Sequence, residues 1–528
     1  MAEVIRDPNQ VIIYDTTLRD GAQMPRIDFN LDDRIAIAGR LAAMGVDVIE
    51  AGFPFAVEGD FEAARAIAET IEGSTISALS RTRHGDIESA WAAIEPASQR
   101  GGARIHTFIG TSDTHMKELG NNVSQTIASA RSAVEKAKEF TDDVEFSPED
   151  ASRTPFKRMM RVILEAVDAG ATTINVPDTV GFAVMGEYAK RLKTVKEQID
   201  SRFGEGLVVV SAHCHDDLGW ATANTLMAIA AGARQAEVTI GGIGERASNT
   251  PEEEVAANIK ERPEAFGNVY TNIDTTQLTP VYREVMERAG LPNQLNKAVT
   301  GRNAFAHEAG IHQHKVKQNR RTYEHMDGER YGQIPAEMVL GKLSGWRGTE
   351  SRLKDIGIVI NPNNPDDRET LKTISKRSKA RSDEMGRHMA DNDIEELAAE
   401  VRGETITDGV QLRDIDPQGD TVKVWLIDGE GELIGKAKHW SDKGNIDAAR
   451  WAVNKITGFD GDIVEWGGKS KSRGSAAVAG IYVTVAQNGS QVEAYAESHD
   501  VEIASIKAYI KAINLIQRAQ ARMETTEE

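Results

Sequence analysis

Two histidines separated by a single residue, His213 and His215, are the most specific chemical signal in the sequence. They end the run LVVVSAHCH, whose β-branched residues predict a strand. Side chains alternate between the two faces of a strand, so both imidazoles point to one face and Cys214 points to the other. Such a pair can bind a metal ion, although the pattern is about as common in purely structural settings. We interpret Cys214 as a small buried hydrophobic residue.

Oxygen ligands for the same ion are available at the ends of other predicted strands. Asp20 and Asn249 are suited to complete a set of two nitrogens and two oxygens that leaves positions open for substrate and water. This set suits Zn²⁺, Mn²⁺, Co²⁺ or, less strongly, Mg²⁺, and it does not choose among them. An ion chelated by the keto oxygen and carboxylate of a 2-oxo acid would make the carbonyl carbon electrophilic.

Charged neighbours add an acid–base element. Arg19 could hydrogen-bond the oxygen on which negative charge develops, or it could form a salt bridge without a chemical role. Glu149 is a candidate base for the methyl group of a thioester, and His312 belongs to the imidazole-rich segment AFAHEAGIHQH. The histidines of that segment could instead form a second metal site, but their irregular spacing makes this the weaker interpretation.

These residues need a scaffold, and the first half of the chain predicts one. It contains eight short strand-like runs separated by amphipathic segments such as Leu31–Met44 and Phe61–Ile71. Eight βα units predict a TIM barrel, whose functional residues lie at the carboxyl ends of the strands. A doubly wound open sheet is the alternative, but the first strand is not followed by a glycine-rich dinucleotide fingerprint. The runs are Val11–Asp15, Val46–Phe53, Ser74–Leu79, Arg104–Ile109, Asp143–Ser147, Thr172–Val176, Leu207–His213 and Ala236–Gly241.

The length of 528 residues exceeds what one core normally supports. We expect a catalytic barrel over residues 1–262, a helical connecting subdomain over 263–402 and an α+β domain over 403–528. The last part contains two similar stretches, Val422–Ile456 and Gly480–Ile516, each with two strands around a glycine turn and then a helix. A single ββα unit cannot bury much surface, so the two units should pack together.

The overall charge limits the possible partners. A net charge of −20 disfavours nonspecific binding to nucleic acid or to an anionic membrane. An anionic substrate therefore needs a local cation, which a metal ion would supply. No apolar run approaches the roughly 18 residues of a membrane span, the first residues lack the features of a secretory signal, and one cysteine cannot form a disulfide framework. We expect a soluble cytoplasmic protein.

Eight motifs make a family resemblance recognisable. They extend nearly continuously from residue 10 to about residue 345 and resemble the 2-isopropylmalate synthase family. That family belongs to a wider group of metal-dependent TIM-barrel enzymes that condense or cleave acyl-CoA compounds. The motifs are DTTLRDGAQ, GFPFAVEGDFE, RIHTFIGTS, DDVEFSPEDASRTP, ATTINVPDTVG, HCHDDLG, GARQAEVTIGGIGERASN and GRNAFAHEAGIHQ.

The resemblance implies roles for individual residues. The metal ligands would be Asp20, His213 and His215, with Asn249 in or near the coordination sphere, and Arg19 would stabilise an enolate or alkoxide. Three positions of this sequence match the family's binding site for the 2-oxo acid. Two more match its acid–base residues for acetyl-CoA, and one matches a supporting tyrosine in the connecting region. These six are His106, Ser147 and Thr179 for the 2-oxo acid, Glu149 and His312 for acid–base work, and Tyr323 in support.

The C-terminal repeat resembles the family's regulatory domain, which binds leucine. GNIDAARWAV (Gly444–Val453) resembles its first half and SHDVEIASIKAYIKAIN its second half. The resemblance therefore implies leucine as an effector and a homodimer, the usual state of the family. Three departures, Ala22, Ser248 and Trp220, surround the expected mouth of the site and put substrate size in question.

Other functions remain open at this point. The same chemistry on pyruvate would make a citramalate synthase, and on 2-oxoglutarate a homocitrate synthase, which would need an extra cation for the distal carboxylate. An acyl-CoA lyase is a further alternative, but that branch generally lacks the duplicated C-terminal domain. A catalytically inactive leucine-binding regulator is disfavoured by the intact Asp20, His213, His215 and Glu149.

Overall fold

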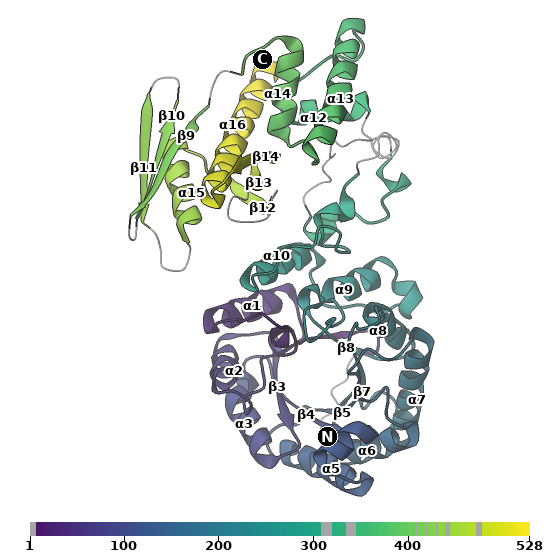
Figure 1. Cartoon of the computed structure of the whole chain (residues 1–528). Helices are drawn as coiled ribbons and strands as arrows, with labels where there is room; N and C mark the ends of the chain where they lie inside the picture. Colours follow the sequence, from purple (N-terminus) through teal and green to yellow (C-terminus); the bar gives the residue numbers. More distant parts are fainter. Residues whose placement is uncertain are drawn as a thin grey trace. The chain divides into compact units, whose positions relative to one another are not determined.

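The computed structural model describes residues 7–307, 319–333, 345–406, 409–418, 421–428, 431–438, 444–470 and 478–527. The chain forms two compact units (Figure 1). The barrel unit comprises Met1–Ala304 and Met326–Pro335, and the C-terminal unit comprises Phe305–His325 and Ala336–Glu528. Among the helices of the described residues, none is both long enough and apolar enough to cross a membrane.

Eight parallel strands close into a barrel, because β8 pairs with β1, and a ring of helices surrounds them (Figure 1). The predicted TIM barrel is confirmed. The strands are β1 Ile12–Asp15, β2 Val48–Glu50, β3 Thr75–Arg81, β4 Ala103–Gly110, β5 Val144–Glu149, β6 Thr173–Asp178, β7 Val209–Cys214 and β8 Gln235–Val238. The helices are α1 Leu31–Met44, α2 Glu58–Thr70, α3 His84–Ile94, α4 Asp113–Leu119, α5 Val123–Lys138, α6 Phe156–Asp168, α7 Met185–Phe203, α8 Ala221–Ala230, α9 Glu252–Glu261 and α10 Leu278–Arg288.

Local sequence explains the best-predicted element, α1. Asn30 and Asp33 form a reciprocal capping box at its start, and Gly45 ends it in the left-handed conformation with φ +95°. The observed bounds equal the predicted Leu31–Met44.

The last predicted strand is shorter than expected, because β8 ends at Val238 and a 3₁₀ turn follows, with Gly241 at φ +69°.

The C-terminal unit combines helices with two small sheets. In its described part, three α-helices precede the repeat, and each half of the repeat is an antiparallel three-stranded sheet with one helix. The helices are α12 Trp346–Asp355, α13 Pro365–Met385, α14 Asp391–Arg402, α15 Gly444–Thr457 and α16 Val501–Glu527. The strands are β9 Gln411–Gln418, β10 Thr421–Ile427, β11 Glu432–Lys438, β12 Asp462–Ser470, β13 Ala479–Gln487 and β14 Ser490–Ser498.

Each half therefore has one strand more than the predicted ββα unit. The additional strands, β9 and β12, lie at the edges of their sheets. Both have weak β signals in the sequence, since β9 contains Pro417 and β12 contains Gly467 and Gly468. An edge strand tolerates such residues because only one of its sides is paired.

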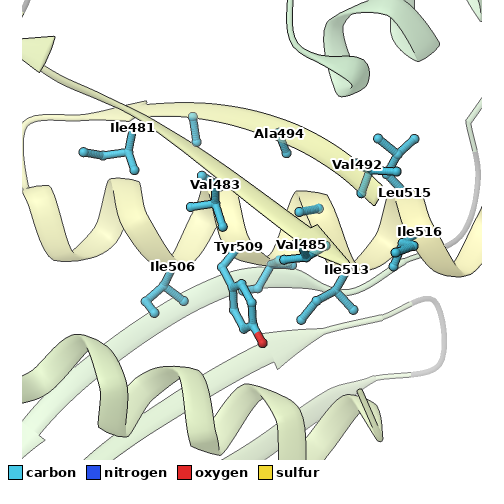
Figure 2. Close-up of a cluster of buried hydrophobic side chains, with 14 of the residues drawn as sticks. Ile481, Val483, Val485, Val492, Ala494, Ile506, Tyr509, Ile513, Leu515 and Ile516 are labelled. Carbon is cyan, nitrogen blue, oxygen red and sulfur yellow. The ribbon is translucent and has the colours of Figure 1, made fainter. Parts of the chain in front are cut away.

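The two halves share one apolar core. Val422, Val424 and Leu426 of β10 belong to the same cluster as Val483 and Val485 of β13. Figure 2 shows Val483, Val485, Val492 and Ala494 facing Ile513 and its neighbours on α16. The Tyr509 hydroxyl reaches across to the first half and donates a hydrogen bond to Asn454 Oδ1 at 2.6 Å. The expectation that the two halves of the C-terminal repeat pack together is confirmed.

Candidate metal centre and active site

Strand β7 places His213 and His215 side by side. Their Nε2 atoms are 3.2 Å apart, and both side chains are buried. Cys214 is also buried, and burial raises the pKa of its thiol to about 12. The thiol is therefore neutral and unreactive at neutral pH, in agreement with its interpretation as a hydrophobic residue.

Backbone pairing at the end of β7 brings Asn249 to the same place. Asp216 N donates to Ser248 O at 2.8 Å, Thr250 N donates to Cys214 O at 3.1 Å, and His215 and Asn249 form an antiparallel bridge. The Asn249 side chain then donates from Nδ2 to Asp20 Oδ1 at 2.7 Å. Within the described part of the chain, Asn249 Oδ1 is buried without a hydrogen-bond partner.

Asp20 completes a group of three potential ligands. Its Oδ2 lies 3.8 Å from His215 Nε2, and one atom each from Asp20, His213 and His215 fall within 4.8 Å of one another. Burial alone would raise the pKa of Asp20, but Arg19 and the two histidines lower it to about 2. Burial lowers the pKa of both His213 and His215 to about 4.

The protonation states at neutral pH are therefore those that metal binding requires. One carboxylate anion and two neutral imidazoles converge, each with a lone pair to offer. The unsatisfied amide oxygen of Asn249 is a fourth available donor. At Gly244 a Cβ atom would come within 2.2 Å of Asn249 Nδ2 and 2.9 Å of Asp20 Oδ1, so only glycine leaves these side chains in place. These residues fit a divalent cation.

Arg19 forms the salt bridges that were one of its two predicted roles. It donates from Nη1 to Asp20 Oδ2 and from Nε to Glu50 Oε2, each at 2.6 Å. Burial lowers the pKa of Arg19, but Glu50 and Asp20 outweigh this effect and the pKa is raised. The guanidinium is thus a permanent cation that is held by carboxylates and also lines the site cavity.

His106 and Ser147 form the next part of the site. His106 Nε2 lies 2.7 Å from Ser147 Oγ, and its Nδ1 lies 2.9 Å from Glu50 Oε1. Asn175 Nδ2 also donates to Ser147 Oγ at 3.0 Å. Burial lowers the pKa of His106, but the hydrogen bond to Glu50 and nearby carboxylates outweigh burial and raise it. Glu50 therefore connects His106 to Arg19.

One cavity of about 270 Å³ collects these side chains. Eight of the predicted site residues line it together with apolar side chains, whereas Asn249 is linked to it through Asp20. The eight are Arg19, Asp20, His106, Ser147, Glu149, Thr179, His213 and His215, and the apolar residues are Phe53, Leu79, Phe108 and Pro177.

The two remaining predicted residues are Tyr323 and His312. Tyr323 belongs to the C-terminal unit, where its side chain is 42% exposed. His312 lies outside the described residues. Of the other imidazoles in its segment, His307 Nε2 is 2.9 Å from Glu324 Oε1, a contact within the C-terminal unit.

The sequence analysis missed several residues of the site. Glu50, Asn175, Glu237, Glu245 and Arg246 were not predicted, yet Glu50 joins two site residues and the other four line the cavity. Glu237 Oε2 lies 2.9 Å from His213 Nδ1, and burial raises the pKa of Glu237 to about 7. For Glu50, Asn175 and Glu237, the available signal was a charged or amide side chain inside an otherwise apolar strand, since such residues are rarely buried without a partner.

A second group of possible ligands lies in the barrel interior. His106, Glu145 and Glu237 also have one atom each within 4.8 Å of one another. Arg104 Nη1 donates to Glu145 Oε2 at 3.0 Å, so a side-chain cation already occupies this group. We interpret it as a polar core network.

Three family models match successive parts of the chain. The HMGL-like model matches residues 10–285, the homocitrate synthase post-HMGL domain-like model matches 299–386, and the LeuA allosteric (dimerisation) domain matches 388–517. The 2-isopropylmalate synthase of Acidimicrobium ferrooxidans is 39% identical over 521 residues, which cover 98% of each chain. The chain belongs to the 2-isopropylmalate synthase family.

Other members of the family show the same extent of similarity. The 2-isopropylmalate synthase of Rhodopirellula baltica is 40% identical and covers 96% of this chain and 94% of its own. That of Thiobacillus denitrificans is 39% identical, covering 97% and 99%. The match to the LeuA domain spans both halves of the C-terminal repeat, so the family resemblance of that repeat is confirmed.

Proposed function

We propose that the protein condenses acetyl-CoA with 2-oxoisovalerate and water to give 2-isopropylmalate and CoA, the first committed step of leucine biosynthesis. The observation that carries this proposal is the shared cavity, in which one carboxylate and two neutral imidazoles adjoin apolar side chains. The polar group suits the 2-oxo acid head, and the apolar residues suit an isopropyl group.

Asp20, His213 and His215 would hold a divalent cation, Mn²⁺, Mg²⁺, Zn²⁺ or Co²⁺, with Asn249 in or beside its coordination sphere. When bound, such an ion supplies Lewis-acid polarisation of a keto oxygen and the positive charge that an anionic substrate needs. Arg19, fixed by Asp20 and Glu50, would donate to the oxygen that gains negative charge.

Three residues would bind the carboxylate end of the 2-oxo acid. Thr179 Oγ1 accepts a hydrogen bond from Asp150 N at 3.0 Å, so its own proton remains available for a substrate oxygen. Ser147 accepts from Asn175 and can donate in the same way. His106 has a raised pKa and adds positive character next to Ser147.

Glu149 is proposed as the base. Burial raises the pKa of its carboxyl, which improves a carboxylate as a proton acceptor. Removal of a proton from the acetyl methyl group gives an enolate, which attacks the keto carbon and leaves an alkoxide that is then protonated. Water hydrolyses the thioester and releases CoA. His312 and Tyr323 are proposed to assist these proton transfers.

The cavity lining favours a branched apolar side chain over a second carboxylate. Two arginines line the cavity, and both are already paired, Arg19 with Asp20 and Glu50, and Arg246 with Asp217 at 2.8 Å. 2-Oxoglutarate would have to compete for one of these pairs. Pyruvate would leave the apolar residues without a partner, so citramalate and homocitrate synthesis are the alternatives to test.

The C-terminal repeat is proposed to bind leucine as a feedback inhibitor and to support a homodimer, in keeping with its match to the LeuA allosteric (dimerisation) domain. We also propose a division of the chain into a catalytic part (1–262), a connecting part (263–402) and a regulatory part (403–528). A cytoplasmic location completes the proposal.

A thiol-release assay on the full chain tests the function. Acetyl-CoA and Mn²⁺ or Mg²⁺ are offered with 2-oxoisovalerate, pyruvate, 2-oxobutyrate or 2-oxoglutarate, with and without leucine. The highest kcat/KM is expected for 2-oxoisovalerate, with inhibition by leucine. Preference for another acceptor would move the protein to a sister reaction, and CoA release from none of them would reject the proposal.

A further inference from the structure

His115 lies on α4 beside the carboxyl end of β5, and the mechanism above does not use it. Its Nε2 is 3.8 Å from Glu149 Oε1, and its Nδ1 is 3.2 Å from Asp150 Oδ2 and 2.9 Å from Ser112 Oγ. We propose that His115 is a positioning residue that holds Glu149 ready as a base, through an Asp150–His115–Glu149 array. The inference rests on the proposed function, in which Glu149 takes the proton.

The surrounding structure holds the imidazole in place. Gly110 ends β4, and a Cβ atom there would come within 2.4 Å of His115 Cβ, so the glycine makes room for this side chain. Asp150 is fully buried and is bound by Arg153 at 2.8 Å, which fixes the carboxylate that Nδ1 faces. Asp150 has φ +62°, in the left-handed region that aspartate adopts more readily than most residues other than glycine.

The orientation of the ring determines what His115 can do. With its proton on Nδ1, toward Asp150 and Ser112, the ring presents a lone pair at Nε2 to Glu149. A protonated Glu149 can donate to that lone pair, and a protonated imidazole can face the Glu149 carboxylate. The separation of 3.8 Å exceeds a hydrogen bond, so the contact without substrate is electrostatic; catalytic contacts commonly tighten only in the substrate complex.

The electrostatic surroundings of Glu149 make His115 the favourable neighbour. Burial raises the pKa of Glu149, Asp150 and Glu118 raise it further, and His115 opposes the rise. Arg153 neutralises Asp150 on the other side. Without the imidazole, the carboxyl would keep only neighbours that disfavour its ionised form. Fewer enzyme molecules would then have Glu149 ready to accept a proton at a given pH.

The test is the pH profile of kcat/KM for acetyl-CoA, measured on full-length enzyme with saturating Mn²⁺ and 2-oxo acid. His115→Gln is expected to lower kcat at neutral pH by roughly 10-fold, less than the ~10²–10⁴-fold that a general acid or base itself contributes, because His115 acts only through Glu149. It should also displace the acid limb to higher pH, because the Glu149 carboxyl is harder to ionise. The KM for the 2-oxo acid and the affinity for Mn²⁺ should remain unchanged. His84→Gln on α3, whose ring contacts Ser132 outside the cavity, is the matched control.

A double-variant cycle separates the possible failures. If His115 acts through Glu149, then His115→Gln should cause little further loss in a Glu149→Gln background. An unshifted acid limb, or full additivity of the two losses, would overturn the role of His115 while leaving Glu149 as the base. Near-normal turnover of Glu149→Gln would instead reject the base assignment and this inference together. If His115→Gln does not fold, His115→Asn, which keeps a polar group near the Nδ1 position, takes its place in the same measurements.

Discussion

The interior of the barrel contains several buried charged side chains, whereas the cluster shown in Figure 2 from the C-terminal unit is mainly apolar. Inside the barrel, Glu50, Glu145, Glu237 and His106 are all almost fully buried. The C-terminal core in Figure 2 is made of valine, isoleucine, leucine and alanine around Tyr509. Burying polar groups costs stability unless each finds a partner. The comparison teaches that the barrel gives up part of its stability to hold a chemical site, whereas the cluster of Figure 2 contributes stability through apolar burial.

The buried ionisable groups of the two regions also differ in their protonation. Burial raises the pKa of Asp15 and of Glu145 to about 7 in the barrel. The buried charges of the C-terminal unit are in close ion pairs, such as Arg352 Nε to Asp391 Oδ1 at 2.6 Å. We therefore expect the barrel to respond to metal and to pH, and the C-terminal core to respond mainly to the loss of apolar volume.

The largest effect should come from His213→Ala. Loss of one imidazole ligand is expected to lower Mn²⁺ affinity by more than about 100-fold, because even residues that only support a ligand contribute 10- to 100-fold. CoA release should fall below detection while the circular dichroism spectrum is retained. Isothermal titration with Mn²⁺ measures the affinity, and His84→Ala is the control. Stoichiometric metal with retained turnover would reject the ligand assignment.

The second prediction concerns the apolar core. Ile513→Ala removes a fully buried side chain from α16 and should lower the free energy of unfolding of the C-terminal unit by ~2–5 kcal/mol. Denaturant titration followed by tryptophan fluorescence reports this, since most tryptophans lie in that unit. Mn²⁺ affinity should not change. Ile434→Ala, at an exposed position on β11, should change stability by less than about 0.5 kcal/mol. Equal losses for the two variants would contradict the comparison.

The third prediction is the pH response of the barrel. Burial and the neighbouring Asp15 hold the pKa of Glu252 well above its ordinary value. Such a carboxyl stays protonated in the folded state while the unfolded chain ionises, so stability falls as pH rises above about 4.5, by about 1.4 kcal/mol per unit for a fully shifted group.

Glu252→Gln removes this titration, and its free energy of unfolding should decrease less between pH 5 and pH 8 than that of the parent chain. Denaturant titrations followed by far-ultraviolet circular dichroism at several pH values provide the measurement. Glu62→Gln, on the exposed side of α2, should leave the parent pH dependence in place. Parallel curves for Glu252→Gln and the parent would show that this carboxyl does not contribute.

The smallest expected effect belongs to Ser248, where the family resemblance suggests glycine. Ser248 has φ +92°, which strains any residue with a Cβ atom, and within the described residues its buried hydroxyl has no hydrogen-bond partner. Ser248→Gly should stabilise the barrel by ~0.5–1 kcal/mol. Ser89→Gly, within α3, should destabilise it by about 0.5 kcal/mol. Thermal unfolding of both variants tests the opposite signs.

Local patterns in the sequence were enough for the scaffold and for half of the metal site. The alternation of side chains along a strand correctly placed His213 and His215 on one face and Cys214 on the other. This relation depends only on neighbouring residues. The period of the apolar residues and the capping signals predicted α1 and the eight βα units. Both are properties of short segments, and short segments carry their own physical signal.

Only the tertiary structure decided which distant side chains share a partner. Glu50 joins Arg19 to His106 because barrel closure brings the ends of β1, β2 and β4 together. Asn249 reaches Asp20 through backbone pairing at the end of β7. The edge strands β9 and β12 form despite weak propensity, since their sheets supply the hydrogen bonds. A sequence pattern describes a residue's neighbours along the chain, whereas these contacts depend on closure, burial and pairing between segments far apart in it.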